Sequence, residues 1–112
     1  MNYSFIVRKA VESDAEAIHS IVEEAFSDYL VRAGIDDVVD QLTETIEYIK
    51  NDIQTKEVFI GFIDDVPVGT IRVNIQNDGT GYISRFGVSP NYHNIGVGKA
   101  LIKLADKFLI LN

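Results

Sequence analysis

Hydrophobic positions recur along the chain with two different periods, and each period predicts one type of element. Residues 3–9, 57–63, 66–75 and 81–88 are rich in β-branched and aromatic residues, which predicts four strands. After the first strand, apolar residues recur every three or four positions, which predicts a helix over residues 14–29 and a second helix that starts near 36 or 37. The same spacing predicts a last helix from residue 97 onward.

The ends of the predicted helices carry recognisable signals. Ser13 with Glu16 three residues later is a capping-box pattern for the first helix, and Gly34 is its expected stop. Asp36 or Asp37 is the expected cap of the second helix. The apolar seam of that helix is formed by Val39, Leu42, Ile46 and Ile49. We expect the acidic residues off this seam to be solvated, namely Asp40, Glu44 and Glu47.

Short turns join the last three predicted strands, which favours an antiparallel meander. Asp64 and Asp65 form one turn pair, and residues 76–79 form a second turn cluster. The resulting order is β-α-α-β-β-β-α, in which helices and strands are segregated. The sequence therefore predicts an α+β fold with a mostly antiparallel sheet, and its 112 residues predict one domain over 1–112.

Composition narrows the function classes. The net charge of −7 argues against a general nucleic-acid binder, which needs a basic surface. The chain has no cysteine, so disulfides and thiol nucleophiles are excluded, and two histidines do not favour a histidine-rich metal site. No apolar run approaches the roughly 20 residues of a membrane span, and the N-terminus lacks the pattern of a signal peptide. A cytoplasmic protein without a metal or a membrane partner is the expectation.

The segment from residue 85 to residue 102 carries the candidate chemistry, because it runs from a strand through a loop into a helix that glycines open. At a helix start the first N–H groups lack partners and the dipole is positive, while Gly96 and Gly98 leave room for a ligand. With Lys99 nearby, this predicts a pyrophosphate cradle. Ala100 replaces the hydroxyl residue that a Walker A loop needs. The alternative is that the glycines only relieve crowding between strand and helix.

The same segment resembles the GNAT superfamily of acyl-CoA-dependent N-acyltransferases. The resemblance is carried by residues that fall in the frame of the family signature, and these are Val88, Pro90, Tyr92, His93, Gly96, Gly98 and Leu101. The predicted order of elements is also that of the family. The resemblance implies a GNAT-like fold, coenzyme A or acetyl-CoA as cosubstrate, and no metal.

The resemblance also implies a set of site residues. It places the pyrophosphate on backbone N–H groups of His93, Asn94, Ile95, Gly96, Val97, Gly98 and Lys99. It places the pantetheine arm beside Phe86, Gly87 and Val88, with the Val88 amide as candidate oxyanion contact. His93 stands where the family usually has Gln or Arg, and the alternative is an exposed loop residue. His19 borders an apolar helix face and is interpreted as structural.

The substrate side is less defined. In the family, carboxylates around the first two helices often attract the amine, which makes candidates of Glu24, Asp28, Asp36 and Asp37. The alternative is that each of these lies on a solvated face. Tyr29 could line a substrate cleft or belong to the helix core. Strand alternation predicts that Ser84 shares a face with Phe86 and Val88, and that Arg85 lies on the other.

The implied function is acetyl transfer from acetyl-CoA to an amine of a small molecule or peptide. The alternative is a non-catalytic module that binds coenzyme A or a protein. Relatives continue past the last helix with a parallel strand beside the segment that corresponds to residues 82–88. A truncation, a reduced domain or a dimer that supplies the missing wall would each explain the short chain. We expect a homodimer through this open sheet edge and the apolar C-terminus, because an uncovered edge promotes association.

Overall fold

Four strands form one antiparallel sheet. The computed structural model describes residues 4–34 and 44–111, and at residues 93, 94 and 108–111 it describes the backbone alone. The sheet order is β1-β2-β3-β4, and neighbouring strands pair antiparallel. The strands are β1 (Phe5–Lys9), β2 (Glu57–Ile63), β3 (Val66–Ile75) and β4 (Gly81–Val88). The four predicted strands and the predicted meander are thereby confirmed.

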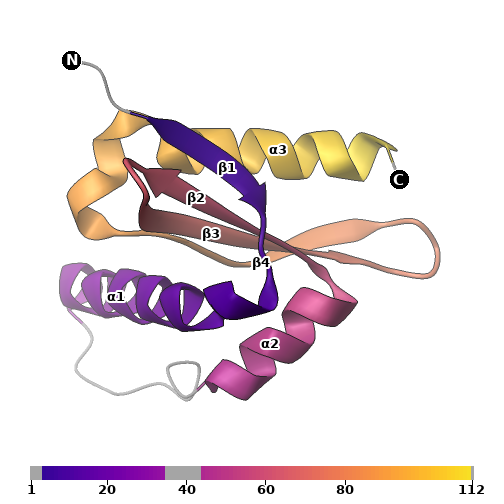
Figure 1. Ribbon diagram of the computed structural model, residues 1–112, viewed down its shortest axis with the longest axis horizontal. Coiled ribbons are helices and arrows are strands. Elements are labelled where there is room, and N and C mark those ends of the chain that lie inside the picture. The colour runs from indigo at the N-terminus through magenta and orange to yellow at the C-terminus, as the bar shows by residue number, and fades with distance from the viewer. Residues whose placement is uncertain (1–3, 35–43, 112) are drawn as a thin grey trace.

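The helices lie on both faces of this sheet. Helices α1 (Ala15–Ala33) and α2 (Ile46–Thr55) cover one face, and α3 (Val97–Leu111) covers the other (Figure 1). Two short 3-10 helices, η1 (Glu12–Asp14) and η3 (Pro90–Ile95), lead into α1 and α3. The order of the described strands and α-helices is the predicted β-α-α-β-β-β-α, and the fold is α+β as expected. No described helix is both long enough and apolar enough to cross a bilayer.

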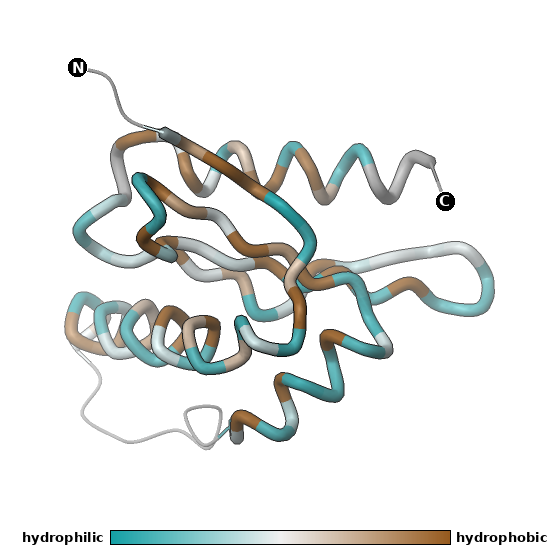
Figure 2. The backbone as a smooth tube through the Cα atoms, viewed as in Figure 1, coloured by the Kyte–Doolittle hydropathy of each residue, from teal (hydrophilic) through white to brown (hydrophobic). Residues whose placement is uncertain are grey.

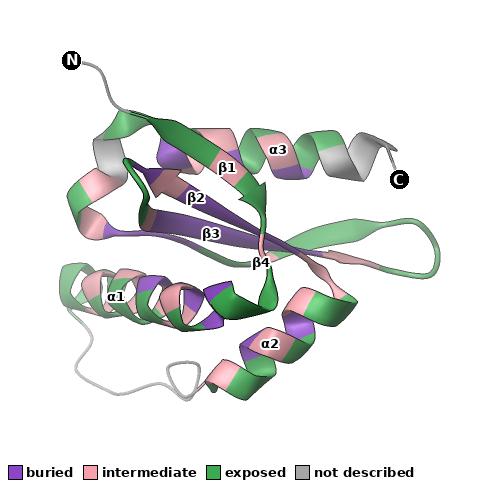
Figure 3. Cartoon of the chain, viewed as in Figure 1, coloured by how far each residue is buried: buried purple, intermediate pink, exposed green. Residues whose placement is uncertain are grey.

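The two central strands separate two hydrophobic cores. On β2, Val58 and Ile60 pack with α1 and α2, while Phe59 belongs to the core beneath α3. Hydrophobic colour and burial both concentrate along β2 and β3 in Figures 2 and 3, whereas the tip of the β3–β4 hairpin is exposed. A strand that is buried on both faces has apolar residues at nearly every position. This explains why residues 57–63 show little alternation of apolar and polar residues.

The start of α1 differs from the prediction. The expected capping box of Ser13 and Glu16 is wrong, because α1 begins one residue after Asp14 and Ser13 lies within η1. The Asp14 carboxylate instead accepts the Val11 N–H at 2.8 Å and two hydrogen bonds from Arg8. Hydrogen bonding by Arg8 lowers the pKa of Asp14 below its usual value. The helix also runs past residue 29 to Ala33, where Gly34 ends it with φ 71°.

In the part of the chain that the structure describes, the second helix, α2, begins at Ile46, whereas the predicted start was near residue 36 or 37. Thr45 is its cap and accepts the Tyr48 N–H at 3.1 Å. Ile49 is fully buried, as its position on the predicted seam requires. The expected caps and the seam residues Val39 and Leu42 lie outside the described residues.

The approach of α3 to the sheet depends on one glycine of β3. A Cβ atom on Gly69 would lie 2.8 Å from both Leu101 Cδ1 and Val97 Cγ1. Gly61 pairs with Gly69 on the neighbouring strand, and a Cβ there would have no neighbour nearer than 3.6 Å. Close contact between helix and sheet is therefore concentrated at Gly69, next to the first turn of α3.

We predict that Gly69→Ala lowers the free energy of unfolding by about 2 kcal/mol, because the added methyl group overpacks the α3 interface. Gly61→Ala is the matched control on the paired strand and is expected to change stability by less than half as much. Denaturant unfolding of both variants measures the difference. Equal stability of the two variants would contradict the seating of α3 on β3.

Candidate functional site

The junction between β4 and α3 brings the first backbone N–H groups of a helix to the end of a strand. The Ser89 N–H closes the sheet by donating to the Val68 carbonyl at 2.8 Å, and η3 then leads to Gly96. Gly96 adopts φ 88°, a conformation that favours glycine, and its carbonyl accepts the Ala100 N–H at 3.0 Å. This is the first hydrogen bond of α3, so the N–H groups of residues 97–99 precede the helical ladder. These three N–H groups therefore have no partner within α3 itself, which is a 15-residue helix.

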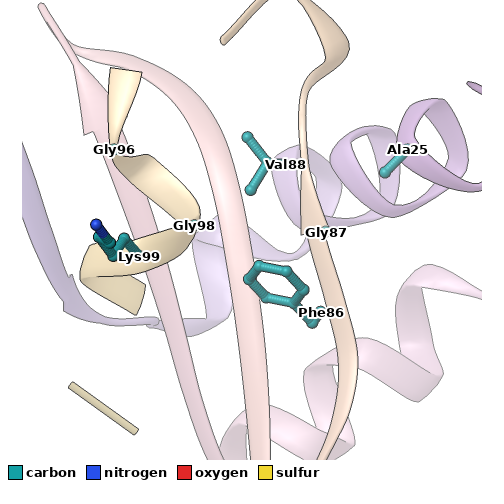
Figure 4. Close-up of a pocket in the computed structure, with 7 residues that line it drawn as sticks. All are labelled: Ala25, Phe86, Gly87, Val88, Gly96, Gly98 and Lys99. Atoms are coloured by element: carbon teal, nitrogen blue, oxygen red, sulfur yellow. The ribbon is translucent and has the colours of Figure 1, made fainter. Parts of the chain in front are cut away.

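A pocket of about 510 Å³ opens beside these donors. Its lining combines α1, the end of β4 and the start of α3, and consists of Ala25, Phe86, Gly87, Val88, Gly96, Gly98 and Lys99 (Figure 4). Six of these seven were among the predicted cofactor residues, and Ala25 was not. The side chain of Val97 is fully buried beneath α3, so only its backbone can face a ligand. Ile95 is 41% exposed, and the side chains of His93 and Asn94 lie outside the described part.

Two glycines keep this pocket open. A Cβ on Gly98 would lie 3.1 Å from the Phe86 ring, and a Cβ on Gly87 would lie 3.2 Å from the Ala25 methyl. Figure 4 shows the Phe86 ring between β4 and the first turn of α3, while the Lys99 side chain points away from that ring. Gly98 thus relieves crowding, as the alternative interpretation held, and the same missing side chain leaves space at the donors.

A β-bulge in β4 interrupts the alternation of side chains between the two faces of the sheet. The register pairs Thr70 with Gly87 and Arg72 with Ser84, so Arg85 and Phe86 together lie opposite one residue of β3. Arg85 has φ 53° and donates from Nε to Glu44. Phe86 turns to the α3 side instead. The expected grouping of Ser84 with Phe86 and Val88 is therefore wrong, because the extra residue places Ser84 opposite Arg72, on the side of α2.

A second pocket of about 360 Å³ adjoins the first. It shares Ala25 and Phe86 with the first pocket, and its full lining is Val22, Ala25, Phe26, Tyr29, Arg85 and Phe86. Tyr29 lines this pocket, and its role in a substrate cleft stays a prediction. Asp28 does not line either pocket, and its carboxylate pairs with Arg32 at 3.0 Å.

Other predicted groups lie away from these two pockets. Glu24 accepts a short hydrogen bond from the Ser89 hydroxyl, and both line a separate hollow between α1 and the start of β3. His19 lies on α1 with Nδ1 3.2 Å from Glu23. The described residues include no group of three or more possible metal ligands.

Comparison with known proteins identifies the family. The profile of the acetyltransferase (GNAT) family matches residues 15–110. The chain belongs to the GNAT acetyltransferase family. No curated protein matches the chain by sequence.

Solved GNAT structures share the fold of this chain. The PaiA N-acetyltransferase from Thermoplasma acidophilum in complex with coenzyme A superimposes with a TM-score of 0.82 at 22% identity, over 95% of this chain and 72% of that one. A GNAT family acetyltransferase from Brucella melitensis in complex with acetyl-CoA gives 0.73 at 18%, over 95% and 68%. A GNAT acetyltransferase from Staphylococcus aureus Mu50 gives 0.74 at 15%, over 95% and 66%. The chain thus spans about two thirds to three quarters of these relatives.

Beside the second pocket, this GNAT chain buries a charge cluster that sequence reasoning missed. Arg72, 1% exposed on the central strand β3, donates to Glu44 at 2.6 and 2.7 Å and to Asp52 at 2.9 Å. Lys56 lies 3.3 Å from Asp52, and Arg85 Nε lies 3.3 Å from Glu44. The predicted solvation of Glu44 is wrong, since its side chain is 6% exposed. An arginine in the middle of an apolar strand was the available signal, because a buried cation needs a carboxylate partner.

The buried cluster favours the ionised form of the Glu44 carboxylate. Burial by itself would raise the pKa of Glu44, but the hydrogen bonds and charge of Arg72, with Arg85, hold that pKa below its usual 4.5. Burial likewise opposes the charge on Arg72, and Glu44 and Asp52 nevertheless raise the Arg72 pKa. A depressed carboxyl pKa stabilises the fold above the unfolded value, and that contribution is lost as the pH falls through the folded value.

We predict that Glu44→Gln lowers the free energy of unfolding at pH 7 by about 3 kcal/mol, because Arg72 loses its bidentate partner in the interior. Glu47→Gln, in the first turn of the adjoining helix α2, is the control; the Glu47 side chain is 84% exposed, and the change should alter stability by no more than about 0.5 kcal/mol. Urea unfolding between pH 3 and pH 7 measures both. The wild type should lose stability as the pH falls below about 4.5, and Glu44→Gln should lose less. The same loss of stability between pH 7 and pH 3 in the two proteins would contradict the pairing of an ionised Glu44 with Arg72.

Proposed function

We propose that this chain binds acetyl-CoA at the junction of β4 and α3 and transfers its acetyl group to an amine. The observation that carries the proposal is the 510 Å³ pocket whose one end is the N-terminus of α3. That helix end offers the three N–H donors of residues 97–99, and its dipole favours an anion. Family membership supports the same activity, and two similar structures hold coenzyme A or acetyl-CoA.

The residues present suit coenzyme A in two respects. The pyrophosphate would lie on the donors of α3 and on the backbone of residues 93–96, with Lys99 adding a cation within the first turn. The pantetheine arm would lie along Phe86, Gly87 and Val88, where the absence of a side chain at Gly98 leaves room beside the Phe86 ring. Apolar walls with a few convergent donors are typical of small-molecule sites.

Bound acetyl-CoA would supply the acetyl group as an activated thioester. In the transfer, a C–N bond forms and the C–S bond breaks, and one proton passes overall from the amine nitrogen to the sulfur. The Ser89 N–H points to β3, so alternation along the strand turns the preceding Val88 N–H toward the outer edge of β4. We propose that this amide is directed at the thioester oxygen, where negative charge develops.

The acceptor amine would occupy the second pocket. This pocket meets the first at Ala25 and Phe86, so an amine there would face the end of the pantetheine arm. Tyr29 would line the acceptor site. Asp28 is not retained as a substrate residue, because its carboxylate is engaged by Arg32 and lines neither pocket.

We predict that acetyl-CoA raises the melting temperature of the chain by several degrees, because a ligand at 100 times its Kd adds about 2.7 kcal/mol to stability. Gly98→Val should weaken this binding at least tenfold by filling the space against Phe86. Lys99→Met should weaken it a few-fold at low salt, and Lys107→Met, about 12 Å further along α3, is the matched control.

Turnover is measured on the same proteins as release of free thiol with a panel of primary amines. Stabilisation by acetyl-CoA with no thiol release above the background rate would favour a non-catalytic coenzyme A-binding module. The absence of any stabilisation would contradict the proposed function altogether.

We also propose that the outer edge of β4 pairs with a second copy of the chain over residues 81–84, away from the residues 86–88 that acetyl-CoA would occupy. In the described residues no strand covers this edge, and its first half carries large apolar side chains, namely Tyr82 and Ile83 at 50% and 39% exposure. We predict a dimer by light scattering after size exclusion, and Ile83→Lys should shift it toward monomer because a charge on an edge strand opposes pairing. A monodisperse monomer at high protein concentration would refute this pairing.

A further inference from the structure

Among the described residues, those that line the second pocket include one charged side chain. Five of its six lining residues are aliphatic or aromatic, and the sixth is Arg85. Figure 4 shows Phe86, which the two pockets share, beside α3. A ligand in the second pocket would therefore meet apolar rings and one guanidinium.

The neutralisation of Arg85 by its neighbours is incomplete. Within the described chain, its guanidinium makes one hydrogen bond, from Nε to Glu44 at 3.3 Å. The Glu44 carboxylate is already bound more closely by Arg72, at 2.6 and 2.7 Å. In the part of the chain that the structure describes, the cluster contains three cations, Arg72, Arg85 and Lys56, against the two carboxylates of Glu44 and Asp52. One positive charge is thus in excess, and Arg85 is its most exposed arginine, at 37% against 1% for Arg72.

The backbone holds Arg85 in this place at a cost. Its φ of 53° lies in the left-handed region that residues with a side chain adopt rarely. Such conformations concentrate at functional sites, where the surrounding structure compensates for the strain. Here the bulge turns Arg85 toward α2 and the second pocket, while Phe86 turns toward α3.

The described carboxylates nearest in sequence to the pocket wall have other partners. Asp28 pairs with Arg32, and Glu24 accepts from Ser89 in a different hollow. A polycationic amine would meet the guanidinium of Arg85 without a described carboxylate in the lining to offset it. An anionic group would instead complete the hydrogen bonding of Arg85, since a guanidinium suits a carboxylate.

We infer that the second pocket selects an acceptor amine that also bears a carboxylate and an apolar or aromatic part, with Arg85 binding the carboxylate. This inference rests on the proposed function, because it names the substrate class of the same acetyl transfer. Arg85 is a specificity-determining residue in this assignment.

The test uses amines that differ only in the charged group. L-Phenylalanine, L-phenylalaninamide and 2-phenylethylamine share a ring and an amine, and only the first carries a carboxylate. The wild type should show a kcat/KM for L-phenylalanine at least tenfold above that for the other two. Arg85→Met should lower that kcat/KM by about 10- to 100-fold, mainly through KM, because a charge-assisted pair is lost. The value for 2-phenylethylamine should stay within twofold.

Two further variants separate charge from structure. Arg85→Lys keeps the charge without the planar fork and should lie between the wild type and Arg85→Met. Lys107→Met removes one positive charge from α3, on the opposite face of the sheet, and should leave the preference unchanged. The melting temperature of each variant checks that the fold is retained.

A binding measurement keeps the test independent of turnover. Saturation-transfer NMR with 3-phenylpropanoate, which cannot be acetylated, should show binding to the wild type and its loss in Arg85→Met. No binding of 3-phenylpropanoate, equal effects of Arg85→Met on charged and uncharged amines, or a preference for spermidine would each overturn the inference. If acetyl-CoA still stabilises the chain, any of these results overturns the inference on Arg85 and leaves the proposed function intact. If acetyl-CoA does not stabilise the chain, the proposed function is wrong, and binding of 3-phenylpropanoate then tests whether Arg85 binds a carboxylate.

Discussion

A buried cation on the central strand constrains how the helices can sit on the sheet. Arg72 is 1% exposed among apolar strands, and an unpaired charge there would be very costly. Its two partners come from the α2 region, with Asp52 on the helix and Glu44 just before it. The position of α2 is therefore determined by charge pairing as well as by the packing of Ile49. Because Glu44 also contacts Arg85, the same constraint extends to the wall of the second pocket.

The bulge on β4 connects this charged interior to the proposed site. By placing two residues opposite one, it directs Arg85 to the face of α2 and Phe86 to the face of α3. One strand thus contributes to both pockets, which meet at Phe86. Gly98 allows the first turn of α3 to approach the ring, and Gly69 seats the same turn against the sheet. The start of α3 is held by packing on both sides, so its first N–H groups need little rearrangement to receive an anion.

Much of the site could be predicted from local sequence. The strand, the loop and the glycines that open α3 are contiguous in the chain. Helix-end chemistry was enough to name Gly96, Gly98 and Lys99, whereas Phe86, Gly87 and Val88 were named from the resemblance to the GNAT superfamily. Ala25 was missed because it comes from α1 and reaches the pocket only through tertiary packing. Glu44 was misassigned because its position relative to an assumed helix seam indicated solvent, whereas its partner lies on a distant strand.

Hydrophobic periodicity determined the strands, the helices and their order. The reason is that an element buried on one face repeats its apolar residues with the period of a helix or a strand, and a strand buried on both faces is apolar throughout. The glycines and turn residues determined where the elements end, since backbone conformation is a local property. The tertiary structure alone decided the pairing of Arg72 with Glu44 and Asp52, because residues far apart in the chain meet only after the sheet forms. It also decided that Ser84 lies opposite Arg72 and not on the face of Phe86, since an extra residue in one strand is visible only against the register of its partner.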